Sequence, residues 1–124
     1  MSALFSRNAK LAVAAIMAQW LLHAFWQVGL SSLPLALRLT VLALALIPGV
    51  PCLIAVLRRQ RSAAFWAGVG SLFYFSHGVM EAWVAEPWRL LAWLEIALAL
   101  LAIFASSSDG LRARFAARKA AASR

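Results

Sequence analysis

The third of four apolar segments contains a histidine and a glutamate whose spacing puts them on one face of a helix. His77 and Glu81 are four residues apart, and Tyr74 precedes His77 by three, so all three side chains share that face. Ionisable groups in a membrane helix are costly to bury, and they usually face the bundle interior and pair with one another. The stretch from Ser71 to Trp83 therefore predicts a polar stripe that faces other helices.

The other three apolar segments carry polar side chains at similar depths. His23 and Gln27 follow Gln19 at intervals of four in the first segment, Arg38 lies in the second, and Glu95 lies in the fourth. At a rise of about 1.5 Å per residue, these groups lie roughly 5–12 Å in from the same side of the membrane. We therefore predict one polar layer in the outer half of the helix bundle. It consists of His23, Gln27, Arg38, Tyr74, His77, Glu81 and Glu95.

Opposite charges within this layer should pair, because an unpaired buried charge costs several kcal/mol. We expect Arg38 to pair with Glu81, and either His77 or His23 to meet Glu95.

The layer has a structural explanation and several functional ones. Polar side chains hydrogen-bond across helix interfaces in membranes, so the layer could simply orient four helices. A site for a ligand, a lipid headgroup or a proton is the alternative, because buried His and Glu side chains titrate usefully. Two histidines and two carboxylates (His23, His77, Glu81 and Glu95) also suit zinc or iron. A tight ligand motif such as His-x-x-x-His is missing from the sequence, and the nearby acids argue against haem held between the two histidines. We expect no metal and no cofactor.

Signatures of enzymes are missing from the sequence. It contains no Ser/His/Asp order, no Gly-rich phosphate loop and no Cys-x-x-Cys motif, and its single cysteine, Cys52, excludes an intrachain disulfide. We therefore expect a protein that is not an enzyme.

The composition places the chain in a membrane. Of its 124 residues, 65% are hydrophobic and only 13% are charged, whereas a soluble domain is about 45–50% apolar and about 25% charged. A soluble domain of this size cannot bury that much apolar surface. In a membrane the apolar surface can instead face lipid. The net charge of +8 then indicates basic loops attracted to anionic lipid headgroups rather than a nucleic-acid partner.

The fold predicted from these patterns is an all-α, four-helix transmembrane bundle. Its spans cover about residues 9–30, 33–57, 63–85 and 88–105, and a basic cytoplasmic tail covers residues 106–124. Pro48 interrupts the second span and predicts a kink rather than a broken helix that lines a site. The run Ser106–Gly110 is expected to end the fourth helix. The tail, with Leu111 and Phe115 among its bases, suits either an amphipathic helix on the inner leaflet or a disordered segment.

The distribution of basic residues predicts that both termini are cytoplasmic. Only Arg38 and Arg89 of the twelve bases fall on the other side of a four-span chain, and basic loops stay in the cytoplasm. The cytoplasmic set is Arg7, Lys10, Arg58, Arg59, Arg61, Arg112, Arg114, Arg118, Lys119 and Arg124.

Residues 45–105 resemble a family of small proteobacterial membrane proteins known as domain of unknown function 2069. The resemblance rests on Pro48-Gly49, the loop Arg58–Arg61, Trp66, Tyr74-Phe75, His77-Gly78-Val79, Glu81-Ala82, Arg89, Glu95 and Phe104. It implies a multi-pass protein of the bacterial inner membrane with four spans, and it implies no activity.

The leading functional hypothesis is a non-enzymatic accessory or scaffold subunit, which packs against another membrane protein or against a second copy. The small-residue pairs Ala64/Gly68 and Ala67/Ser71 favour it, because they allow another helix to approach closely. The rival is a protein that handles a small solute, a proton or a lipid through His77, Glu81 and Glu95.

Overall fold

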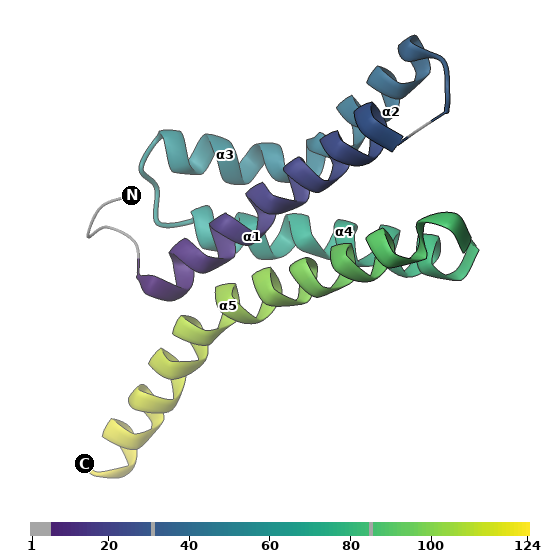
Figure 1. The fold of residues 1–124 in the computed structure, drawn as a ribbon. Helices are drawn as coiled ribbons and strands as arrows, with labels where there is room; N and C mark the ends of the chain where they lie inside the picture. The colour runs from purple at the N-terminus through teal and green to yellow at the C-terminus, as the bar shows by residue number, and fades with distance from the viewer. Residues whose placement is uncertain (1–5, 31, 85) are drawn as a thin grey trace.

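The computed structural model describes residues 6–30, 32–84 and 86–124, and the regular elements in these ranges are all helical (Figure 1). The main helices are α1 (Arg7–Ala24), α2 (Leu35–Leu46), α3 (Val50–Leu57), α4 (Ala63–Val84) and α5 (Arg89–Ala122). Short turns of other helical types are a π-helical turn η1 (Phe25–Leu30) and the 3₁₀ turns η2 (Ile47–Gly49) and η3 (Glu86–Trp88). The predicted all-α class with four helical segments is confirmed, since α2, η2 and α3 form one bent segment. The predicted end of the third span, at Ala85, lies outside the described residues.

The bend between α2 and α3 follows from Pro48. Proline has no backbone N–H and clashes with the preceding turn, and here the chain tightens into the 3₁₀ turn Ile47–Gly49 before α-helix resumes. The hydroxyl of Tyr74, on α4, donates a hydrogen bond of 2.7 Å to the carbonyl oxygen of Ala45 beside the bend. The predicted kink is therefore present, with a neighbouring helix supplying a polar partner to the backbone there.

Small residues let the helices approach closely. The antiparallel pair α4 and α5 forms the largest helix contact, and α1 packs against both (Figure 1). Ala12, Ala67 and Ala99 are completely buried. A Cβ atom added to Gly70 would collide with the carbonyl oxygen of Pro48, and one added to Gly68 would collide with the Ser106 hydroxyl. The small residues that predicted a face for another helix are thus used for packing within this chain.

The predicted end of the fourth helix near Ala105 is wrong, because α5 continues to Ala122. The hydroxyls of Ser106, Ser107 and Ser108 donate to carbonyl oxygens of the preceding helical turn, so they are satisfied without leaving the helix. The Ala- and Arg-rich sequence that follows has high helix propensity. The last turns of α5 extend beyond the other helices, with Leu111 and Phe115 exposed (Figure 1).

By length and composition, three helical stretches of the described residues are apolar enough to cross a membrane: Arg7–Leu30, Leu35–Leu57 and Arg89–Ala122. The third predicted span, α4, is not among these stretches, although it has 22 residues. It carries Tyr74, His77 and Glu81 of the predicted polar layer. Its outer surface is still apolar, since Phe65, Phe73 and Trp83 are exposed.

Candidate functional site

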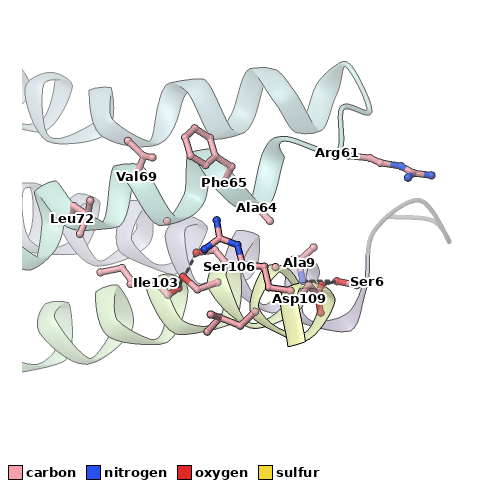
Figure 2. Close-up of a pocket in the computed structure, with 15 residues that line it drawn as sticks. Ser6, Ala9, Arg61, Ala64, Phe65, Val69, Leu72, Ile103, Ser106 and Asp109 are labelled. Atoms are coloured by element: carbon pink, nitrogen blue, oxygen red, sulfur yellow. Dashed lines mark hydrogen bonds between the residues drawn. The ribbon is translucent and has the colours of Figure 1, made fainter. Parts of the chain in front are cut away.

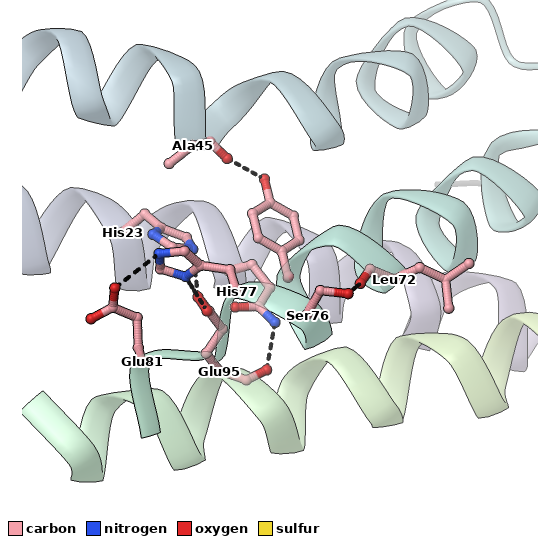
Figure 3. Close-up of polar contacts among 9 residues, drawn as sticks. His23, Ala45, Leu72, Ser76, His77, Glu81 and Glu95 are labelled. Atoms are coloured by element: carbon pink, nitrogen blue, oxygen red, sulfur yellow. Dashed lines mark hydrogen bonds and ion pairs between the residues drawn. The ribbon is translucent and has the colours of Figure 1, made fainter. Parts of the chain in front are cut away.

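The carboxylate of Glu95 is the centre of the polar cluster that the helices enclose. Glu95 belongs to α5, and none of its surface is exposed. Its Oε2 atom lies 2.8 Å from Nε2 of His23, on α1. Its Oε1 atom lies 2.6 Å from Nδ1 of His77, on α4 (Figure 3). The sequence predicted that one of the two histidines would meet Glu95, and the fold brings both onto the same carboxylate.

The two histidines differ in their access to the surroundings. The His23 side chain is only 3% exposed, whereas that of His77 is 40% exposed. The second ring nitrogen of His77, Nε2, lies 3.8 Å from Oε1 of Glu81 one helical turn away (Figure 3). His77 therefore connects the buried carboxylate of Glu95 with the partly exposed carboxylate of Glu81.

Two residues of the cluster were not among the predicted site residues. Gln19 is completely buried, and its side-chain amide donates a 2.8 Å hydrogen bond to the backbone oxygen of Glu95. The indole of Trp26 stacks on His23 with an angle of 7° between the rings. For Gln19, the sequence held a signal, because this residue lies four positions before His23 and so shares its helix face. Sequence patterns gave no comparable signal for Trp26.

The predicted pairing of Arg38 with Glu81 is wrong. Arg38 instead donates a 3.2 Å hydrogen bond to the carbonyl oxygen of Val28, a backbone position in the π-helical turn that follows α1. Gln27 lies in the same turn, and its buried Oε1 has no hydrogen-bond partner within the described residues. Within the part of the chain that the structure describes, neither Arg38 nor Gln27 forms a hydrogen bond or ion pair with Glu95.

A cavity of about 290 Å³ adjoins the cluster between the bent second segment and α4. His23, Tyr74 and His77 supply its polar surface. Its apolar lining comes from Val41, Leu44, Ala45, Pro48 and Phe73. The cavity gives a small ligand a place beside the two imidazole rings.

The geometry argues against haem and is compatible with a metal ion. The rings of His23 and His77 have centroids 5.5 Å apart and both contact the Glu95 carboxylate. A porphyrin held between the two rings would have to displace that carboxylate, so haem is not supported. One nitrogen from each histidine and one Glu95 oxygen all lie within 4.8 Å of one another, and this donor set suits a transition-metal ion.

A larger hollow of about 930 Å³ lies at the other end of the bundle, between the start of α4 and the middle of α5 (Figure 2). Its lining combines apolar side chains such as Phe65 with Arg61 and Arg114. Asp109 borders it and accepts hydrogen bonds from Ser6 and Asn8 at the start of α1. These bonds lower the pKa of Asp109 below its ordinary value.

Comparison with known proteins agrees with the class that the fold indicates. The helices and their apolar outer surfaces define a small all-α protein of the membrane class. A family model described as "Predicted membrane protein (DUF2069)" matches residues 11–114, and the chain belongs to this family. The match is wider than the resemblance found in the sequence, since it includes the first helix and the start of the tail. Neither a curated protein nor a solved structure matches the chain.

Proposed function

We propose that this protein is a multi-pass protein of the bacterial inner membrane that binds a small polar ligand at the Glu95 cluster, without being an enzyme. One observation carries the proposal. Glu95 is completely buried between two histidines, and one of these, His77, is 40% exposed and lines a cavity of about 290 Å³. A polar group that only holds helices together has no need of such access.

The packing of small residues also favours a ligand site over a scaffold. A scaffold argument needs small residues that remain free to receive a partner helix. In this chain Ala67 and Ser71 are completely buried, and Gly68 and Gly70 already contact other segments of the same chain. The small-residue face is therefore occupied.

An accessory subunit remains the second candidate because of α2. None of the described side chains of this helix is buried, and Leu35, Leu37, Leu39 and Leu44 are exposed. Lipid covers such a surface equally well, so we place this role second. Membrane lipids, and either another membrane protein or a second copy of the chain, are the partners that this surface suits.

The arrangement of charges supports a topology with both termini in the cytoplasm and four crossings. Ser6 and Asn8, next to the N-terminal bases, contact Asp109 near the C-terminal ones. Arg61 and Arg114 border the same hollow. The three groups of bases thus gather at one end of the bundle, as expected for one cytoplasmic surface.

Native mass spectrometry of the full chain, extracted from its own membrane in mild detergent, tests the ligand site. We expect the wild-type chain to carry a small additional mass that His77→Gln loses. Ser76→Ala is the matched control, because Ser76 lies beside His77 on α4 and its hydroxyl donates to the Leu72 carbonyl oxygen of its own helix. Thermal unfolding of the three proteins should give similar midpoints.

Two outcomes would contradict the ligand site. One is a wild-type chain that carries no added small mass. That chain would be either bare or bound to a second protein that His77→Gln still binds, and a bound protein would indicate an accessory subunit. The other is a His77→Gln variant that unfolds well below Ser76→Ala while its mass is unchanged, since His77 would then serve only to hold the helices together.

A further inference from the structure

We propose that His23, His77 and Glu95 bind a divalent transition-metal ion of the zinc or ferrous-iron class. This inference rests on the proposed function, because it names the ligand of the same site. The ligand atoms would be Nε2 of His23, Nδ1 of His77 and a carboxylate oxygen of Glu95, and the fold already holds these groups within 4.8 Å of one another.

The donor set selects the class of ion. Two imidazole nitrogens and one carboxylate oxygen occur in zinc sites that keep a fourth position open and in the facial triad of non-haem iron sites. Magnesium and calcium prefer oxygen ligands throughout. At metal–ligand distances of about 2.1 Å, tetrahedral ligand atoms are about 3.4 Å apart. From Oε2 of Glu95, Nε2 of His23 lies 2.8 Å away and Nδ1 of His77 lies 3.0 Å away, so each distance must widen by about half an ångström to admit the ion.

Two residues lie behind the ligands, where metal sites usually have supporting groups. A histidine that binds a metal usually directs its second nitrogen to a carboxylate or a backbone carbonyl, which fixes the ring. Nε2 of His77 lies 3.8 Å from Oε1 of Glu81, within ion-pair range but longer than a hydrogen bond. Gln19 bonds the backbone of Glu95 at 2.8 Å and so ties the ligand's helix to α1.

The charges balance when the ion is present. Two carboxylates, Glu95 as ligand and Glu81 behind His77, neutralise a doubly charged ion, whereas an unbalanced charge inside the helix bundle would be strongly unfavourable. The cavity beside His23 and His77 gives the ion a route and leaves space for its fourth ligand. The sequence suggested four candidate metal ligands. In this proposal three of them, His23, His77 and Glu95, bind the ion, and the fourth, Glu81, orients the ring of His77.

Cobalt and zinc binding test this assignment on the full chain without an affinity tag, purified in mild detergent and stripped with a chelator. We expect one Co²⁺ per chain, with the visible absorption of a four- or five-coordinate ion, and displacement of the cobalt by Zn²⁺. His77→Gln and Glu95→Gln should each weaken binding at least tenfold, and Glu81→Gln should weaken it by about tenfold. Asp109→Asn, which removes an equal charge at the other end of the bundle, should bind like the wild type.

Three results would overturn the metal site: no visible cobalt spectrum, less than one ion per chain at saturation, or His77→Gln binding as tightly as the wild type. His77 is partly exposed, so this variant remains informative if Glu95→Gln does not fold. If neither ion binds, yet His77→Gln still loses the small mass found after extraction, the metal assignment is wrong and the proposed ligand site stands. If His77→Gln binds cobalt normally and also keeps that mass, both proposals fail.

Discussion

Among the acidic residues whose burial the structure describes, Glu95 is the one that is completely buried. It contacts a histidine on each of two other helices. Glu81 is a carboxylate on a neighbouring helix with one distant contact at 3.8 Å and a side chain that is 24% exposed. Comparing substitutions of Glu95 and Glu81 therefore distinguishes the effect of a buried carboxylate on stability from that of a partly exposed one.

Glu95→Ala should lower the free energy of unfolding by about 3–5 kcal/mol, because it leaves polar groups buried without a partner. Glu81→Ala should lower it by less than about 1 kcal/mol, since its contact is long and partly solvated. Denaturant unfolding in detergent, followed by circular dichroism, measures both. Equal effects of the two substitutions would show that Glu95 is not the centre of the cluster.

At the scale of the elements, close contact between α4 and the bent second segment depends on a glycine. A Cβ atom at Gly70 would collide with the Pro48 carbonyl oxygen, whereas one at Gly110 on α5 would meet nothing within 4 Å. Gly70→Ala should therefore destabilise the protein by about 1–3 kcal/mol through forced separation of the helices. Gly110→Ala should be neutral or stabilise by up to about 1 kcal/mol, because alanine has the higher helix propensity. Thermal unfolding measures the stability of both variants. A Gly70→Ala protein that is more stable than Gly110→Ala would contradict this packing.

The contact between the start of α1 and the middle of α5 should depend on pH. Hydrogen bonds from Ser6 and Asn8 hold the pKa of Asp109, which lies outside the predicted span, below its ordinary value of 3.8. A lowered folded-state pKa means that the carboxylate stabilises this contact fully above the ordinary value. The stabilisation is lost as the pH falls through the lowered value.

Carboxyl ¹³C NMR of Asp109 in the detergent-solubilised chain measures this shift. Asn8→Ala removes the 3.0 Å bond and leaves the Ser6 cap of α1 in place, so it should raise the pKa of Asp109 towards 3.8. An unchanged titration in this variant would show that Asn8 does not hold the carboxylate.

At the scale of the whole molecule, the basic end of the bundle should face the cytoplasm. A fluorescent protein fused after Arg124 should therefore be bright, and alkaline phosphatase fused at the same point should be inactive, because the phosphatase needs the oxidising periplasm to form its disulfides. Fusions in the turn before Pro34 should give the opposite pattern. Active phosphatase after Arg124 would show that the C-terminus is periplasmic, so that the orientation or the number of crossings differs from the proposal.

The sequence by itself determined the helical class, the four segments and the kink at Pro48. These features depend on local properties: the length of apolar runs, turn residues between them, and the missing N–H of proline. The family assignment followed from the same local pattern around Tyr74 and Glu81, and the match over residues 11–114 confirms it.

Only the tertiary structure decided which polar groups meet. Depth along a helix can be estimated from the rise per residue, but helix rotation and separation cannot, so Arg38 found the Val28 carbonyl instead of Glu81. The same limit hid the role of Gln19 and the convergence of both histidines on Glu95. The length of α5 was missed for a related reason. Ser106–Gly110 favours a helix end when taken alone, but the serines bond within the helix and Asp109 is held by residues about a hundred positions earlier in the chain.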